Sequence, residues 1–244
     1  MYKLSLNQVQ SKKVSDFIYE QLEEAIILKE FFSNERLPSE RELSTLFNCS
    51  RLALREALAA LEQHGLIEKR LGAKGGTFVL PTTKRSNHRS SSEIKSSWKD
   101  LMDIFEYRSI IEPEAARLAA LRISDEELDS LQVILDQSQH QLIEREEFRS
   151  LDVKFHLLIG RASGNTYLER AIRKIRTLIN PALDLMPYSN EVKTKTITDH
   201  KHLLAALHER NSTLTKEMMF NHIHGSTEAI SNQFSKHSIT NDET

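Results

Sequence analysis

Two helix-start signals lie close together in the segment LPSERELSTLFNCSRLALREALAALEQHG. In the first, Ser39 and Glu42 form a capping box, in which a hydroxyl and a carboxylate satisfy backbone donors of the first helical turn. In the second, Ser50 caps a longer helix that stops at Gly65. A very short connection remains between the two helices. The sequence therefore predicts a helix-turn-helix.

The flanking segments complete a small domain. Upstream, apolar residues recur at helical spacing and predict a helix over about residues 12–31. Downstream, LIEKRLGAKGGTFVL combines strand-like ends with glycines that permit the positive φ angles of a hairpin. Helices followed by a basic hairpin indicate a winged helix-turn-helix domain at residues 1–80. We expect the buried side of its second helix to comprise Leu43, Leu46 and Phe47.

The rest of the chain predicts a second domain that is entirely helical. Residues 81–97 lack apolar periodicity and are rich in Ser and basic residues, which is typical of a linker. An all-α bundle should follow over residues 98–238, with a tail at 239–244. The fold class is thus mainly α. Periodicity and breaks place the helices of the bundle at about 98–121, 125–143, 147–162, 165–185, 192–208 and 214–234.

Composition narrows the cellular setting. The chain is 39% hydrophobic and 28% charged, which is typical of soluble globular proteins. Its apolar runs are far shorter than the roughly 20 residues of a membrane span, and its N-terminus has no signal-peptide core. The single cysteine, Cys49, excludes an intramolecular disulfide and any multi-cysteine metal site. These features favour a cytoplasmic protein without a membrane partner.

Charge is distributed unevenly between the two parts. Residues 1–90 carry 14 Lys and Arg against 11 Asp and Glu, while residues 91–244 carry 19 against 24. Arg51 and Arg55 lie one turn apart near the start of the third helix, which is the end that enters the major groove in helix-turn-helix proteins. An arginine fork matches the acceptor atoms of guanine. Taken alone, such arginines are more often solvated surface charges.

Other basic or polar residues of this domain are suited to the DNA backbone. Ser50 and the free amides at the start of its helix can hold a phosphate. Arg41 lies on the preceding helix, and Lys74 lies at the expected hairpin tip. Together with the capping pattern, these residues make DNA binding the preferred interpretation of the N-terminal domain.

The stretch LDVKFH suggests a metal site in the helical domain. Asp152 and His156 are four residues apart and share a helix face, and carboxylate and imidazole are both good ligands for divalent transition metals. Residues two apart on a helix point in nearly opposite directions, so the pairs His200-x-His202 and His222-x-His224 each supply one inward residue. Apolar periodicity selects His200 in the first pair. In the second it favours His222 less strongly.

The sequence resembles a known family in both parts. The segment LPSERELSTLFNCSRLALREALAALEQHGLIEKRLGAKGGTFV resembles the DNA-binding domain of GntR-type bacterial transcription regulators. The stretches MDIFEYRSIIEPEAARLAA, LDVKFHLLIGRASGN and DHKHLLAALHERN resemble the FCD effector domain of the FadR subfamily. The resemblance implies a homodimer that binds double-stranded, palindromic operator DNA, most often as a repressor, and that is released by a small carboxylate such as a sugar acid, hydroxy-acid or dicarboxylate.

The same resemblance assigns roles to individual residues. It implies a metal site of Asp152, His156, His200 and His222, and it places Arg108 against the carboxylate of the effector. Three imidazoles and one carboxylate suit Zn first, with Ni, Mn or Fe as other choices. The resemblance implies that DNA is contacted by Arg41, Ser50, Arg51, Arg55, Lys74 and Gly75.

Several alternatives stay open at the level of the sequence. One alternative makes the C-terminal domain a metalloenzyme-like domain, since open positions on a metal can activate water. No extra carboxylate or nucleophile stands out as a general base, so we predict a regulator and not an enzyme. The metal could also be structural, or could itself be the signal. Arg108 alone would be expected to pair with Glu112, one turn further on.

Overall fold

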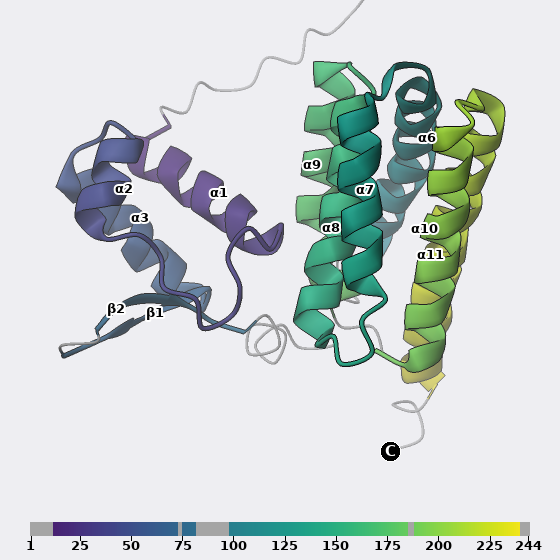
Figure 1. The fold of residues 1–244 in the computed structure, drawn as a ribbon. Coiled ribbons are helices and arrows are strands. Elements are labelled where there is room, and N and C mark those ends of the chain that lie inside the picture. The colour runs from purple at the N-terminus through teal and green to yellow at the C-terminus, as the bar shows by residue number, and fades with distance from the viewer. Residues whose placement is uncertain (1–11, 73–74, 82–97, 185–187, 240–244) are drawn as a thin grey trace, which may run out of the picture.

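The computed structural model describes residues 12–72, 75–81, 98–184 and 188–239, and it shows two domains that lie side by side (Figure 1). The mainly helical fold predicted from the sequence is confirmed. The N-terminal domain has helices and a two-stranded antiparallel sheet, in which Ile67 pairs with Val79 and Arg70 with Gly76. Its elements are α1 (Val14–Ile27), α2 (Glu40–Leu46), α3 (Arg51–Gln63), β1 (Ile67–Arg70) and β2 (Gly76–Val79).

Local signals at the start of α2 and α3 explain the helix-turn-helix. The Ser39 hydroxyl accepts a hydrogen bond from the backbone N–H of Glu42, and the Glu42 carboxylate accepts one from the backbone N–H of Ser39. Ser50 accepts from the N–H of Ala53. Gly65 follows α3 with a φ of 68°, a left-handed conformation in which glycine costs little. Helices α2 and α3 therefore begin at the predicted N-caps, and α3 stops before Gly65 as the sequence predicts.

The ends of α1, α7 and α11 and the exposure of Leu46 differ from the predictions, and α11 continues to Ile239 instead of ending near residue 234. Helix α1 ends at Ile27, before residue 31, because Lys29 adopts a left-handed φ of 61° that breaks the helix. Helix α7 ends at Ser138, before residue 143, although Ile143 is still buried beyond the helix end. Leu46 is 76% exposed, because the short α2 turns only Leu43 fully toward the core.

The C-terminal domain is a bundle in which α6 packs against α8, α9 and α11 (Figure 1). Helices α8 and α9 face the N-terminal domain, whereas α10 and α11 lie on the far side. Apolar side chains from several helices form its main core, and polar side chains are buried beside them. Its helices are α6 (Trp98–Arg122), α7 (Asp125–Ser138), α8 (Arg145–Ala162), α9 (Thr166–Leu183), α10 (Asn190–His208) and α11 (Ser212–Ile239).

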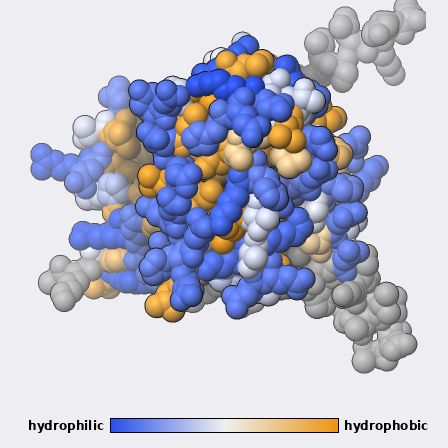
Figure 2. All heavy atoms as spheres, turned by 45° about the vertical axis from the view of Figure 1, so that its right-hand side comes forward, coloured by the Kyte–Doolittle hydropathy of each residue, from blue (hydrophilic) through white to orange (hydrophobic). Residues whose placement is uncertain are grey.

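Hydrophilic side chains cover most of the face shown in Figure 2, with hydrophobic side chains showing between them. Across the described residues, none of the helices has the length and apolar character needed to cross a membrane. Some large apolar side chains are nevertheless exposed, among them Tyr107, Ile110 and Leu121 on α6. Their spacing puts them on one stripe of that helix.

Candidate metal centre, ligand cavity and DNA-binding surface

Helices α8, α10 and α11 bring four residues together inside the C-terminal domain. Asp152, His156, His200 and His222 are all buried, and each directs one potential ligand atom to a common point, with these atoms within 4.8 Å of one another. The Oδ1 atom of Asp152 lies 3.8 Å from Nε2 of His156 and 3.6 Å from Nε2 of His200. His202 and His224 are exposed instead, as periodicity predicts.

Carboxylates behind the imidazoles fix which ring nitrogen faces this point. Nδ1 of His156 lies 2.5 Å from Oε2 of the buried Glu112, and Nδ1 of His222 lies 3.1 Å from Oδ2 of Asp199. Each Nδ1–H therefore donates to a carboxylate, and each Nε2 keeps its lone pair for the centre of the cluster. The ring of His200 stacks on Phe155 with centroids 4.0 Å apart, which holds its orientation.

The environment favours neutral imidazoles and ionised carboxylates. Burial lowers the pKa of His156 to about 3, and the nearby charge of Arg176 acts in the same direction. Burial likewise lowers the pKa of His200 well below its usual value. For Asp152, burial alone would raise the pKa, but Arg176 and Arg149 outweigh it and hold the pKa well below its usual range. Neutral imidazoles beside a carboxylate are the protonation states that metal binding requires.

The carboxylates behind the imidazoles are also held ionised. Burial raises the pKa of Glu112, but Arg108, His156 and Arg176 outweigh it and bring the pKa well below its usual range. The pKa of Asp199 is lowered to about 2, because its hydrogen bonds with His222 and Lys195 outweigh partial burial. Both carboxylates can therefore accept the imidazole N–H groups at neutral pH.

The atoms at the centre of the cluster fit a cation. Nε2 of His156 and Nε2 of His222 are 3.2 Å apart, and two lone pairs at that distance repel unless positive charge lies between them. Nε2 of His200 is buried without a hydrogen-bond partner among the described residues. Since Zn–N and Zn–O bonds are about 2.0–2.2 Å long, separations of this size match ligands of one ion. The cluster is therefore able to hold a metal.

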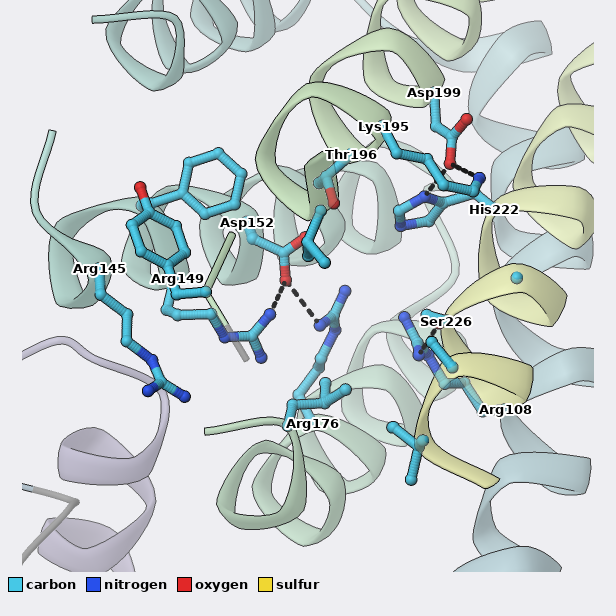
Figure 3. Close-up of a pocket in the computed structure, with 17 residues that line it drawn as sticks. Arg108, Arg145, Arg149, Asp152, Arg176, Lys195, Thr196, Asp199, His222 and Ser226 are labelled. Atoms are coloured by element: carbon cyan, nitrogen blue, oxygen red, sulfur yellow. Dashed lines mark hydrogen bonds and ion pairs between the residues drawn. The ribbon is translucent and has the colours of Figure 1, made fainter. Parts of the chain in front are cut away.

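A cavity of about 140 Å³ opens beside Asp152 and His222 (Figure 3). Its lining is rich in cations, which outnumber the acidic Asp152 and Asp199, and it also has apolar walls that include Phe148 and Ile230. The Oδ2 atom of Asp152 accepts hydrogen bonds from Nη1 of Arg149 at 3.2 Å and from Nη1 of Arg176 at 3.1 Å. The lining cations are Arg108, Arg145, Arg149, Arg176 and Lys195.

Several guanidinium N–H groups of the arginines that line this cavity lack a hydrogen-bond acceptor in the described part of the chain. They are Nε and Nη2 of Arg176, which is completely buried, and Nη2 of Arg149. Burial lowers the pKa of Arg176 to about 10, with Glu112 acting in the opposite direction, so the guanidinium is still charged at neutral pH. A buried donor without a partner is costly, and an acidic ligand would satisfy it.

Arg108 also lines the cavity, but its guanidinium donates more of its hydrogen bonds within the protein than that of Arg176. Its Nε donates to Glu112 at 2.7 Å, and its Nη1 donates to the Ser226 hydroxyl at 3.3 Å. The ion pair with Glu112 that the sequence offers as the alternative for Arg108 is thus present, and Arg108 faces the cavity as well. The sequence prediction missed Arg149, Arg176 and Asp199, and it named Glu112 only as a partner of Arg108 and not as the acceptor behind His156.

The predicted DNA contacts lie on the exposed side of the helix-turn-helix. Arg41 on α2 and Arg51 at the start of α3 are exposed, as is Ser50. Arg55 is exposed too, but its Nε donates to Glu40 at 2.8 Å, which partly neutralises it. A side chain on Gly75 would meet the backbone oxygen of Arg70 at 2.5 Å, so glycine is needed in the hairpin. Lys74 falls outside the described residues.

Two protein-family models match the chain. The model for bacterial regulatory proteins of the gntR family matches residues 14–79, and the FCD domain model matches residues 103–225, which is just over half of the chain. The chain belongs to the GntR family of bacterial transcription regulators and carries an FCD domain. The predicted family is thereby confirmed, and so is the prediction that the protein is a regulator and not an enzyme.

Curated relatives agree with this family. The HTH-type transcriptional repressor NanR of Cronobacter sakazakii is 34% identical over 161 residues, which are 63% of this chain and 60% of the relative. NanR of Escherichia coli K12 is 32% identical over the same length, 63% of this chain and 59% of the relative. The similarity to these repressors thus spans about three fifths of their length.

Solved structures share the fold at low sequence identity. McbR/YncC of E. coli has a TM-score of 0.57 and 18% identity, covering 92% of this chain and all of that chain. A GntR transcriptional regulator of Rhodococcus sp. RHA1 has a TM-score of 0.53 and 14% identity, covering 89% of this chain and 97% of the other. Both similarities concern the fold alone.

Proposed function

We propose that this GntR regulator is a repressor that binds a palindromic operator as a homodimer and releases it when a small carboxylate binds in the C-terminal cavity. The relatives named as repressors support the sign of regulation. In this proposal the winged helix-turn-helix comprises residues 1–80, the linker 81–97 and the effector domain 98–238. Because its target is operator DNA, we expect the protein to act in the bacterial cytoplasm.

The metal is part of the proposal. Asp152, His156, His200 and His222 would hold a divalent transition metal, with zinc as our first choice because imidazole and carboxylate are its usual ligands. When bound, such an ion supplies a positive centre for the carboxylate and hydroxyl oxygens of an effector. Glu112 and Asp199 keep the Nδ1 protons of His156 and His222 directed away from it.

One observation carries the proposal of an acidic effector. In the lining of the cavity, Arg176 has two buried guanidinium nitrogens without a hydrogen-bond acceptor among the residues that the structure describes, and Arg149 has one. Planar guanidinium groups bind carboxylates through paired, charge-assisted hydrogen bonds. The cavity of about 140 Å³ suits a small molecule. We therefore expect a sugar acid, a hydroxy-acid or a dicarboxylate, with Arg108 as a further contact.

Titration calorimetry of the zinc-loaded protein with representative small acids tests the effector. We expect at least one acid to bind and to weaken binding to operator DNA obtained by selection from random duplexes. Arg176→Gln should reduce affinity for that acid, whereas Arg170→Gln, an exposed change on the same helix, should not. If no acid alters operator affinity but removal of the metal does, the metal itself is the signal and the acidic-effector proposal is wrong.

DNA recognition is proposed to follow the geometry of other winged helices. The start of α3 would enter the major groove, with Arg51 and Arg55 at base edges and Arg41 and Ser50 at phosphates. Lys74 and Gly75 of the hairpin would lie against the DNA backbone or minor groove. Two such domains in a dimer would read successive half-sites.

The exposed apolar side chains Tyr107 and Ile110, about one turn apart on α6, support a contact between two copies, because exposed apolar side chains that lie together favour association. Sedimentation analysis of wild type and Ile110→Glu tests this contact. A dimer that the substitution weakens is expected, and a wild-type monomer at micromolar concentration would contradict the dimer proposal.

A further inference from the structure

A row of alternating charges leads from the ligand cavity to the N-terminal domain. Asp152 of the metal cluster accepts from Nη1 of Arg149 at 3.2 Å, and Nε of Arg149 lies 3.5 Å from Oδ1 of Asp184. The other oxygen of Asp184, Oδ2, lies 2.9 Å from Nζ of Lys29, which belongs to the N-terminal domain. All four side chains are at least largely buried, so solvent and salt screen these interactions weakly.

Lys29 has two features that are unusual for a lysine. It has a φ of 61° just after the end of α1, a position where glycine is the common residue because a side chain is strained there. Its side chain is also only 4% exposed, although lysines are almost never buried unless they are paired. The ion pair with Asp184 explains both, since a glycine would relieve the backbone but would leave Asp184 without this partner.

The backbone around Lys29 is fastened to the same region. The Ser150 hydroxyl of α8 donates to the carbonyl of Lys29 at 3.3 Å, and Nδ2 of Asn180 of α9 donates to the carbonyl of Ile27 at 3.2 Å. Figure 3 shows the pale purple ribbon of the N-terminal domain beside the cavity wall that carries Arg145. The end of α1 is thus held by the helices that line the cavity.

We propose that the row Asp152, Arg149, Asp184 and Lys29 couples the cavity to the position of the DNA-binding domain. The regulatory meaning of this coupling rests on the proposed function, which supplies the occupant of the cavity. Arg149 is shared between Asp152 and Asp184, and its Nη2 is buried without an acceptor within residues 12–72, 75–81, 98–184 and 188–239. An acidic group that takes this N–H competes with Asp184 for the guanidinium. The hold of Asp184 on Lys29 then changes, and with it the anchoring of α1.

The coupling must act in both directions. If an acid in the cavity changes the strength of the Lys29 anchor, then displacement of Lys29 must change the affinity for that acid by the same factor. DNA that draws the N-terminal domain away from Asp184 would therefore alter ligand affinity through this row. Lys29 and Asp184 act here as positioning residues, because neither is a proposed ligand of the metal.

A second group of ion pairs at the same interface provides a matched control. Arg173 of α9 lies 2.8 Å from Glu24 and 3.0 Å from Glu30, both of the N-terminal domain. Its side chain is 36% exposed, and it does not line the cavity. Loss of Arg173 should therefore loosen the domain contact without involving the charge row.

Hydrogen exchange in the full-length protein tests the coupling without any ligand. The N–H of Leu28 donates to Glu24, and that of Glu30 to Ala25, so exchange of these amides reports opening at the end of α1. Wild type, Lys29→Met, Arg149→Gln and the double variant would be compared. We expect Arg149→Gln to speed exchange about five-fold in the wild-type background and to have almost no effect in the Lys29→Met background.

These four proteins form a double-mutant cycle. Additive effects of the two substitutions on the exchange rates would overturn the proposal, and so would an Arg149→Gln variant whose amides exchange at the wild-type rate. In the control cycle, Arg173→Gln should speed exchange by itself, and Arg149→Gln should add its full effect. If Arg149→Gln fails to fold, Asp184→Asn replaces it. Asp184→Asn should speed exchange in the wild type and not in Lys29→Met, and equal effects in both would again overturn the coupling.

Titrations of the same variants with zinc and with small acids separate this inference from the proposed function. Absence of zinc or acid binding in the wild type would contradict the proposed function, while the exchange cycle would still decide the coupling. If an acid binds, Lys29→Met should reduce the change in operator affinity that it causes by about five-fold. An unchanged acid response would overturn the regulatory role of the row.

Discussion

The cores of the two domains are built differently. In the N-terminal domain the buried cluster is apolar and includes Leu54, Leu58 and Leu61 of α3, while its charged residues lie on the surface or at the domain interface. In the C-terminal domain an apolar cluster of similar kind is joined by buried charged and ionisable side chains. These are Arg108, Glu112, Asp152, His156, Arg176, His200 and His222.

The composition of each core indicates whether the proposed binding residues of that domain lie on its surface or in its interior. An apolar core fixes the shape of the helix-turn-helix, and the side chains that we propose to contact DNA are exposed on α3. In the C-terminal domain, paired charges are buried around a cavity, although a buried ion pair is often no more stabilising than apolar side chains of the same size. Such an arrangement is expected where a binding site lies inside the core.

Replacement of Glu112 by Leu should have the largest effect, because it leaves the buried Arg108 without its carboxylate and removes one of the two carboxylates close to the buried Arg176. We expect the C-terminal domain to lose about 3–5 kcal/mol in its free energy of unfolding. Zinc affinity should fall about 10–100-fold, since His156 loses the partner of Nδ1. Denaturant unfolding and zinc titration measure the two effects.

Glu114→Gln is the matched control for this change. Glu114 is two residues further along α6 and forms partly exposed ion pairs with Arg117 and Lys216. Its replacement should change stability by less than about 1 kcal/mol. Equal effects of the two substitutions would show that the buried charges contribute no more to the free energy of unfolding than the partly exposed ones.

Leu58→Ala tests the apolar core in the same way. Leu58 is completely buried, so the cavity left behind should cost about 2–5 kcal/mol in the unfolding of the N-terminal domain. Operator binding should weaken at temperatures where that domain melts, while zinc affinity should stay unchanged. A loss of zinc binding in this variant would mean that the two domains do not divide the functions as described.

Arg51→Ala should separate DNA recognition from stability. Arg51 is exposed at the start of α3, and its loss should weaken operator binding by about 1–3 kcal/mol if it contacts a base. The free energy of unfolding should change by no more than about 0.5 kcal/mol. Arg161→Ala, at an exposed position of the C-terminal domain, should leave operator affinity unaffected in fluorescence anisotropy.

Acidification should destabilise the C-terminal domain, with a smaller effect than the substitutions. The folded state keeps His156 neutral because its pKa is about 3, whereas the unfolded chain protonates this residue near its ordinary pKa of 6.5. Unfolded protein therefore binds more protons between these values, and stability falls as the pH decreases through this window.

Carboxylates in the C-terminal domain extend the same trend to lower pH. The pKa of Asp199 is about 2 in the folded state against an ordinary 3.8, so its contribution is present above about pH 4 and is lost as the pH falls toward 2. Scanning calorimetry of metal-free protein should show a melting temperature that decreases from pH 7 to pH 4. A constant or rising melting temperature would contradict the neutral, buried His156.

Local signals in the sequence predict much of the fold and part of the site. The caps at Ser39 and Ser50 depend on residues within one helical turn, so the helix starts are readable. Helical periodicity also separates the buried His200 from the exposed His202. In each case the deciding interaction involves neighbours in the chain.

The remaining features depend on contacts between distant segments. Glu112 meets His156 across 44 residues, and Arg176 meets Asp152 across 24, so periodicity cannot assign them as partners. Helix α1 ends at Ile27, and the left-handed Lys29 just beyond it is paired with Asp184 in the other domain, a contact that local periodicity does not reveal. Leu46 is predicted to be buried because it is apolar, but its exposure depends on the orientation of a seven-residue helix, which the local sequence does not determine.

Metal analysis of protein purified without a His tag or chelator tests the central claim most directly. The wild type should contain about one transition metal per chain, with zinc as the expected element, and the double variant His156→Ala, His200→Ala should contain almost none. Circular dichroism would establish that the variant remains helical. A wild type that holds no metal, even after reloading with zinc, would contradict the account of Asp152, His156, His200 and His222 as a metal centre.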